Sequence, residues 1–146
     1  MKVQILLLCL LRLQKIIIKS MEEKTKILVV DDDSGIGEML QTLLEFYGFE
    51  VTVTEKPDEA ENIIQQKEID LVMLDMLISG VNGTDVCAGI RENEKIKDVP
   101  VLMMSALHDA GPKCKEAGAD DFMAKPFEME DLIKKINHIL EKKDVS

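Results

Sequence analysis

Acidic residues follow each of two uninterrupted apolar runs in this sequence. Three aspartates, Asp31, Asp32 and Asp33, follow the first run, and Asp75 follows the second. A run of aliphatic residues without polar alternation is typical of a parallel strand that is buried on both faces. Carboxylates that meet at the ends of neighbouring strands repel one another unless a cation, a shared proton or a reaction uses them. These aspartates are therefore the first candidates for chemistry.

Two further polar residues follow predicted strands. Ser105 follows the apolar run 101–104, and Lys125 follows the weaker run 121–124. Clustered carboxylates without histidine or cysteine suit a hard cation such as Mg²⁺, which binds few protein oxygens and keeps several waters. A carboxylate beside such a cation can attack phosphorus, while a hydroxyl and a lysine can bind phosphoryl oxygens. The residue types predict phosphoryl transfer with Mg²⁺.

The elements that must position these residues alternate between strand and helix patterns from Lys26 onward. Five strand–helix units with short connections indicate an α/β fold, with a parallel sheet and helices on both faces. The second and fifth strands are the least apolar, so we expect them at the sheet edges. This favours a flavodoxin-like (βα)5 doubly wound sheet with strand order 2-1-3-4-5, in which the strands before Asp31 and Asp75 are neighbours. The first helix is expected to bury one stripe of side chains, namely Ile36, Met39, Leu40, Leu43, Leu44 and Tyr47.

The bulk composition limits the classes of function. The 146 residues carry a net charge of −10, and residues 1–20 contain four cations and no acid, which leaves a net charge of −14 on the remainder. Such an acidic body argues against binding to nucleic acid, which needs a basic face. The three widely spaced cysteines fit a reducing cytoplasm, where thiols act as small packing residues.

Residues 1–20 differ from the rest of the sequence. Their apolar stretch breaks after residue 11, whereas a transmembrane helix needs about 20 apolar residues, and no small-residue cleavage site follows. Met21 opens a polar lead-in to the first strand. We predict that translation begins at Met21 and that residues 1–20 are an upstream-start artefact. The alternative is a basic amphipathic segment that touches a membrane.

Four segments in order resemble the receiver domain of two-component response regulators. The resemblance runs from about Lys26 to Leu140, and the segments that carry it are 27–33, 71–83, 101–106 and 119–127. It implies a domain over residues 24–142, followed by a tail at 143–146. It further implies a stand-alone, chemotaxis-regulator-like phosphoprotein of the cytoplasm rather than an enzyme.

The resemblance also implies a role for each site residue. Asp75 is the phosphoacceptor, which takes phosphate from a sensor histidine kinase or a histidine phosphotransfer protein. Mg²⁺ is bound by Asp31, Asp32 and Asp75 together with the backbone carbonyl of Leu77, whereas Asp33 is assigned to helix capping.

The remaining family roles concern the switch between two states. Lys125 contacts the phosphoryl group and precedes a cis bond to Pro126. Ser105 and Phe122 act as the switch. They repack a partner-binding face formed by the fourth predicted helix (112–117), the fifth strand (121–124) and the fifth helix (129–139). No output domain follows in the sequence, so we expect the signal to pass to an unknown protein target.

Two features depart from the family pattern. Ser79 stands where the family usually has proline, four residues after the phosphoacceptor, which predicts a less constrained loop. Leu77 and Leu107 occupy positions whose side chains lie over the phosphoryl group in this family. Because neither side chain can orient an attacking water, we hypothesise that the aspartyl phosphate hydrolyses slowly.

Two other functions compete with the signalling receiver. A haloacid-dehalogenase-like phosphatase would use Asp31 and Asp33 as its Asp-x-Asp motif, but it does not explain Asp75 with Gly83 eight residues later. A receiver-like module that binds without being phosphorylated is disfavoured by the complete set of acids, hydroxyl and lysine.

Overall fold

Five parallel strands form one sheet in the computed structural model, which describes residues 2–145. The strands are β1 (Lys26–Val30), β2 (Glu50–Thr54), β3 (Leu71–Asp75), β6 (Val101–Ser105) and β7 (Asp121–Ala124). Their spatial order is β2-β1-β3-β6-β7, which confirms the predicted order 2-1-3-4-5 and places the two least apolar strands at the edges. Because β1 pairs with β3, the chain after Val30 and the carboxyl end of β3 meet at one edge of the sheet.

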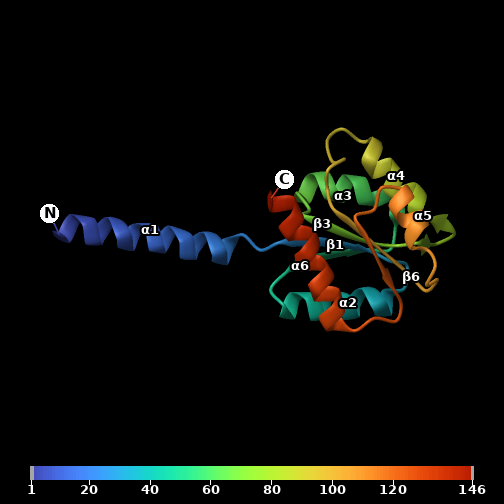
Figure 1. The fold of residues 1–146 in the computed structure, drawn as a ribbon, viewed down its shortest axis with the longest axis horizontal. Helices are drawn as coiled ribbons and strands as arrows, with labels where there is room; N and C mark the ends of the chain where they lie inside the picture. The colour runs from blue at the N-terminus through green and yellow to red at the C-terminus, as the bar shows by residue number, and fades with distance from the viewer. Residues whose placement is uncertain (1, 146) are drawn as a thin grey trace.

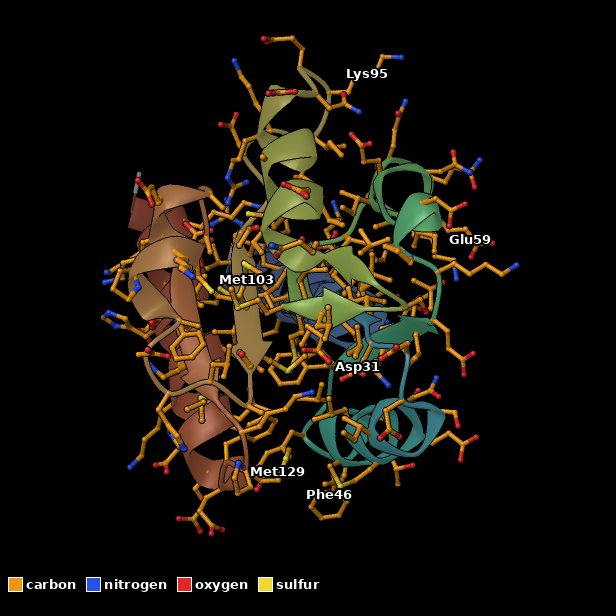
Figure 2. All side chains as sticks on the ribbon, turned by 90° about the vertical axis from the view of Figure 1, so that its right-hand side faces the viewer. Asp31, Phe46, Glu59, Lys95, Met103 and Met129 are labelled. Carbon is orange, nitrogen blue, oxygen red and sulfur yellow. The ribbon has the colours of Figure 1, made fainter. Side chains whose placement is uncertain are left out.

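Helices cover both faces of the sheet (Figure 1). Strand side chains alternate between the two faces, so Leu28 and Val30 belong to one core cluster and Ile27 and Val29 to the other. Met103 lies within the body in Figure 2 and belongs to the first cluster. The helices that pack on that cluster are α3 (Ala60–Lys67), α4 (Gly83–Glu92) and α5 (Gly111–Glu116), whereas α2 (Ser34–Phe46) and α6 (Met129–Val145) pack on the other.

Three small elements, a 3₁₀ turn and the two strands of a hairpin, were not expected from the sequence. A 3₁₀ turn, η1 (Pro57–Glu59), leads into α3, and β4 (Leu77–Ile78) pairs antiparallel with β5 (Val81–Asn82). Ser79 and Gly80 connect this hairpin with φ angles of 51° and 79°. Positive φ at both central residues is the backbone pattern of a tight two-residue hairpin turn. Strands of two residues are too short for hydrophobic periodicity to reveal them.

The predicted inward stripe of α2 is wrong at Met39 and Tyr47, which are both 47% exposed. Leu40 and Leu44 are buried as expected, but the third buried position of α2 is Gly37. A Cβ atom at Gly37 would lie 2.8 Å from Val53 Cγ1, so glycine lets α2 lie close against β2. Gly37, Leu40 and Leu44 share one face of the helix, and this close contact turns Met39 and Tyr47 toward solvent.

The helix α1 (Lys2–Glu22) extends away from the body formed by the other elements (Figure 1). Its described side chains from Lys2 to Ile18 are exposed, and they include Cys9, which therefore is not a packing residue. The other two thiols, Cys87 and Cys114, are buried as expected. Among the residues that the structure describes, no helix combines the length and the apolarity needed to cross a membrane.

Candidate functional site

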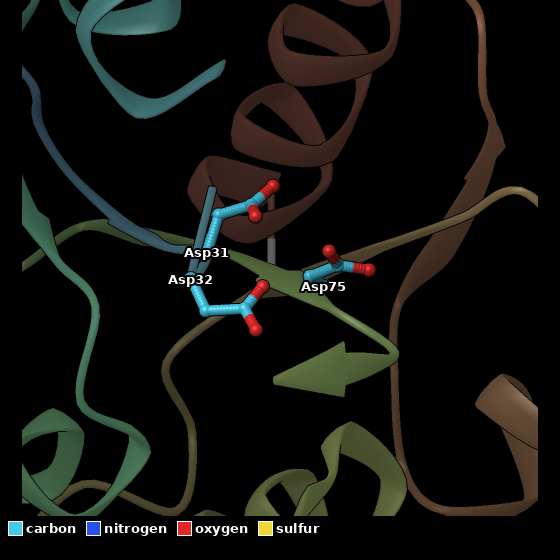
Figure 3. Close-up of side chains that lie close together, drawn as sticks. All are labelled: Asp31, Asp32 and Asp75. Atoms are coloured by element: carbon cyan, nitrogen blue, oxygen red, sulfur yellow. The ribbon is translucent and has the colours of Figure 1, made fainter. Parts of the chain in front are cut away.

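Three carboxylates meet at the carboxyl edge of the sheet. One oxygen from each of Asp31, Asp32 and Asp75 lies within 4.8 Å of the others. Figure 3 shows Asp31 and Asp32 after β1 and Asp75 at the end of β3, with their side chains around a common space. The sequence prediction that β1 and β3 bring these acids together is confirmed.

Asp31 is the most buried acid of the group, with 1% of its surface exposed. Its Oδ1 accepts a hydrogen bond from the Asp33 backbone amide at 3.0 Å, which leaves Oδ2 directed toward the site. Asp33 itself does not join the cluster. Its Oδ1 accepts from the amides of Gly35 and Ile36 and caps α2, as predicted from the sequence.

Asp32 is exposed, and the β4–β5 hairpin holds it in place. Its Oδ2 accepts a hydrogen bond from the Ser79 backbone amide at 2.8 Å. A proline at position 79 would have no amide hydrogen to donate. The expectation that Ser79 only loosens this loop therefore missed a contact that ties the loop to a carboxylate of the cluster.

Lys125 bridges two of the acids. Its Nζ donates to Asp31 Oδ2 at 3.0 Å and to Asp75 Oδ2 at 3.1 Å. The backbone places Lys125 there because its amide donates to the Ser105 carbonyl at 2.7 Å at the end of the β6–β7 pairing. The Lys125–Pro126 peptide bond is cis, as the family resemblance implied.

Burial and charge act in opposite directions on this ion pair. Burial raises the pKa of Asp75, and the nearby positive charge of Lys125 lowers it only in part. Burial alone would lower the pKa of Lys125, but the hydrogen bond that it donates to Asp31 and the charges of both acids outweigh burial and raise the pKa. Lys125 therefore stays an ammonium that faces two carboxylates.

Gly83 brings the chain after the hairpin close to the end of β3. Its amide donates to the Met76 carbonyl at 2.6 Å. A Cβ atom at this position would lie 2.2 Å from the Asp75 carbonyl oxygen and 2.9 Å from Met76 Cα. Only glycine fits here without a shift of the backbone that carries Asp75, which explains the eight-residue spacing between Asp75 and Gly83.

A hollow of about 750 Å³ opens beside Asp75. Ser105 and Lys125 line it together with Asp75, so three of the predicted site residues share one space. Leu77 and Leu107 line the same hollow and are 67% and 62% exposed. Ser105 is buried, and its Oγ accepts from the Leu107 amide at 3.0 Å, which leaves the hydroxyl hydrogen available to a ligand.

Phe122 does not line this hollow. Its side chain is partly buried and packs against the core cluster beneath α3, α4 and α5. Phe122 pairs in register with Met103, and Ser105 lies two residues after Met103, so strand alternation directs Ser105 and Phe122 toward the same face of the sheet. The two predicted switch residues thus share a face of the sheet.

The residues present suit a small divalent cation. Three carboxylate oxygens within 4.8 Å, with no nitrogen or sulfur donor among them, form the all-oxygen environment that Mg²⁺ prefers. All three acids also accept hydrogen bonds from backbone amides, which orient them: Asp31 from Asp33, Asp32 from Ser79, and Asp75 from Leu77 at 3.5 Å. The part assigned to the Leu77 carbonyl stays a prediction.

Comparison with known proteins identifies the family. The family model described as "Response regulator receiver domain" matches residues 27–137. The chain belongs to this receiver-domain family. Receiver domains are signalling phosphoacceptors that interact with histidine kinases or phosphotransfer proteins, and they generally bind Mg²⁺ at an acidic pocket.

Individual relatives agree with this assignment. The chain is 33% identical over 121 residues to the DNA-binding dual master transcriptional regulator RpaA of a Synechocystis strain, covering 82% of this chain and 50% of the relative. It is 38% identical over 119 residues to the probable transcriptional regulator ycf27 of Cyanophora paradoxa, covering 80% of this chain and 48% of the relative. The receiver therefore spans about half the length of these curated relatives.

A solved structure supports the fold. The chemotaxis response regulator CheY4 of Vibrio cholerae superimposes with a TM-score of 0.75 at 27% identity, over 81% of this chain and 100% of that chain. The receiver fold thus accounts for the sheet, its flanking helices and the edge at which the acids meet.

Proposed function

We propose that this receiver accepts a phosphoryl group on Asp75 and switches a partner-binding face. The observation that carries the proposal is the convergence of Asp75, Ser105 and Lys125 on one hollow beside three clustered carboxylates. The donor is a sensor histidine kinase or a histidine phosphotransfer protein. The target is a protein rather than nucleic acid, because the body is strongly acidic.

The residues divide the transfer between them. A carboxylate oxygen of Asp75 attacks phosphorus, a new O–P bond forms, and the bond from phosphorus to the donor breaks so that the donor leaves with its electron pair. Lys125, held 3.1 Å from Asp75 Oδ2, supplies positive charge to one phosphoryl oxygen. Ser105 donates its hydroxyl hydrogen to another.

Asp31, Asp32 and Asp75, with the backbone carbonyl of Leu77, would hold Mg²⁺. When bound, this cation neutralises negative charge on the acids and on the phosphoryl oxygens. Asp31 is oriented for this by the Asp33 amide, and Asp32 by the Ser79 amide.

The signal would leave the site through the face formed by α5, β7 and α6. A hydroxyl of Ser105 that moves toward the phosphoryl group leaves space on the sheet face that it shares with Phe122. Phe122 then turns further inward and changes the packing of α5 against β7. The ion pair between Lys135 and Asp121, at 3.3 Å, joins α6 to β7 on this face.

The domain bounds and the location complete the proposal. Residues 24–142 form the receiver domain and 143–146 a tail, although α6 runs without a break to Val145; Ser146 lies outside the described residues. The protein acts in the cytoplasm.

Incubation with acetyl phosphate and Mg²⁺ tests the phosphoacceptor directly, with intact-mass measurement of covalent phosphate. We expect labelling of the parent, none of Asp75→Ala, and loss of labelling from the parent when the cation is chelated. Labelling of Asp75→Ala at the parent rate would refute the proposal.

Asp33→Ala is the matched control, because Asp33 lies near the cluster but caps α2. We expect this variant to be labelled like the parent, at a cost of about 1 kcal/mol in stability from the lost cap. The phosphatase alternative predicts the reverse, since it uses Asp31 and Asp33, and it also predicts steady turnover of phosphate esters.

A further inference from the structure

The large apolar side chains of α1 between Val3 and Ile18 lie largely in solvent. Eleven large apolar side chains between Val3 and Ile18 are exposed by 43 to 77%. In the rest of the described chain, six large apolar side chains are exposed; Leu77 and Leu107 line the hollow beside Asp75, and none of the six belongs to a run as long as that of α1. Contiguous apolar surface of this kind marks a site of interaction with another body, whereas scattered residues need no explanation.

Because α1 is helical along its whole length, we also expect its apolar face to pack against another surface. Most of the stability of a short helix comes from packing of its apolar face, and isolated helices are marginal in water. α1 has 21 residues and extends away from the body (Figure 1). The packing that would stabilise this helix must therefore come from outside the described chain.

The distribution of charge indicates the kind of surface. Residues 1–20 carry four cations and no acid, while the rest of the chain has a net charge of −14. Arg12 and Lys15 lie three residues apart, on one side of the helix, and Leu6, Leu10 and Leu13 follow the spacing of another side. A wide apolar face beside a narrow basic stripe is typical of helices that lie in the plane of a membrane.

A second copy of the chain is a poorer occupant. Leu6, Leu10 and Leu13 have the spacing of a two-helix seam. Such a seam would leave Leu8 and Leu11 exposed, and it would bring the cations of two helices together without acids to neutralise them. Anionic lipid headgroups attract the same cations and neutralise them.

In place of the upstream-start artefact predicted from the sequence, we propose that α1 binds the surface of anionic membranes, with its apolar face among the acyl chains, Arg12 and Lys15 at the headgroups, and the acidic body in solution. α1 does not span the bilayer, in agreement with the absence of a membrane-crossing helix among the described residues. The short segment 23–25 joins the bound helix to the receiver domain, and the net charge of −14 on residues 21–146 keeps that domain off an anionic surface.

Flotation of the full chain with vesicles tests this proposal. We expect the protein to float with phosphatidylcholine vesicles that contain phosphatidylserine, to float less with pure phosphatidylcholine, and to be released partly by salt. The double variant Arg12→Glu/Lys15→Glu should lose the preference for anionic vesicles. Leu10→Glu should weaken binding to both kinds of vesicle by about tenfold or more, because a charge enters the apolar face.

Two matched controls keep the result specific to α1. Lys113→Glu/Lys115→Glu makes the same charge change on α5, and Phe46→Glu puts a charge in place of an exposed apolar residue on α2. Both should float like the parent. The α1 variants should also retain labelling by acetyl phosphate, because α1 lies outside the folded body.

Several results would overturn the proposal. The first is the absence of flotation, and the second is equal binding to both kinds of vesicle with no effect of salt. The third is the formation of concentration-dependent dimers that bury the whole apolar face of α1. A native protein whose intact mass shows a start at Met21 would overturn it for the cell.

Discussion

The backbone amide of Ser79 donates a hydrogen bond to Oδ2 of Asp32 at 2.8 Å, across 47 residues of sequence. This contact links the turn of the β4–β5 hairpin to an exposed acid of the proposed cation site. It depends on two properties of position 79, a backbone N–H and a φ angle of 51°. The family usually has proline at this position, and proline has neither property.

Replacement of Ser79 by proline should weaken binding of the cation. Without the amide, the Asp32 side chain is free to rotate, and it must lose this conformational freedom when the cation binds. We therefore expect the Kd for the cation to rise by about two- to tenfold. Isothermal titration with Mg²⁺ or electron paramagnetic resonance with Mn²⁺ measures this constant. Ser79→Ala keeps the amide and should bind like the parent. Equal constants for Ser79→Pro and Ser79→Ala would contradict the assigned role.

Polar substitutions at Leu107 and Leu77 should shorten the life of the aspartyl phosphate. Both leucines line the hollow beside Asp75, and neither can position a water for attack on phosphorus. A carboxylate in Leu107→Glu or an amide in Leu77→Asn can do so, and we expect hydrolysis to accelerate by about tenfold, which is 1.4 kcal/mol in the barrier. The decay of covalent phosphate after removal of the donor gives the half-life.

Met39→Glu provides the control for these variants, because Met39 is an exposed apolar residue on α2 outside the hollow. Its half-life should equal that of the parent. A longer half-life in Leu107→Glu or Leu77→Asn would be evidence against slow hydrolysis caused by the leucines.

Removal of the charge of Asp75 should stabilise the fold in metal-free buffer. Burial raises the pKa of Asp75 above its ordinary value of 3.8, so the folded state binds the proton more tightly than the unfolded state. Ionisation therefore destabilises the fold as pH rises through the window between 3.8 and the raised pKa of the folded state. Asp75→Asn should melt higher than the parent above this window, and the difference should vanish below pH 3.8.

Thermal melts at several pH values in the presence of a chelator measure this effect. Asp98→Asn, which removes one negative charge from an exposed position far from the hollow, is the matched control. A melting temperature of Asp75→Asn below that of the parent at neutral pH would mean that the ion pair with Lys125 outweighs burial, which contradicts a raised pKa of Asp75.

Arg91 should be a stabilising residue without a part in phosphorylation. Its guanidinium donates to the carbonyls of Gly118, Lys97 and Val99 and to Asp120, at distances from 2.5 to 2.9 Å. Arg91→Ala should lower the free energy of unfolding by about 2–3 kcal/mol because it removes charged hydrogen bonds to partly buried groups. Chemical denaturation measures the loss.

Two variants calibrate this result. Arg91→Lys should recover only a small part, since an ammonium cannot reproduce the planar arrangement of donors. Lys95→Ala, at an exposed residue of the loop between α4 and β6 (Figure 2), should leave stability within about 0.5 kcal/mol of the parent. Labelling by acetyl phosphate should be unchanged in all three variants.

The strand order and the positions of the acids could be predicted from local patterns. Strands buried on both faces must be apolar throughout, so the runs before Asp31, Asp75 and Ser105 identified the central strands. The less apolar runs identified β2 and β7 as edges. The cap at Asp33 is also local, because its acceptor and donors lie within three residues.

Local patterns did not predict the exposure of Met39 and Tyr47. Hydrophobic periodicity locates the apolar side of a helix but does not say how closely the helix approaches the sheet. At Gly37 the approach of the helix depends on Val53 in strand β2. A Cβ atom at position 37 would lie only 2.8 Å from Val53 Cγ1. That distance is a property of the packed fold.

The sequence by itself determined the residue types at the ends of four strands and hence the kind of chemistry to expect. Tertiary structure decided which atoms meet. Lys125 bridges Asp31 and Asp75 across 94 and 50 residues, and Ser79 holds Asp32 across 47. Such contacts depend on register between strands and on the turn of a two-residue hairpin, and neither leaves a periodic signal in the chain because each is fixed by packing between distant segments.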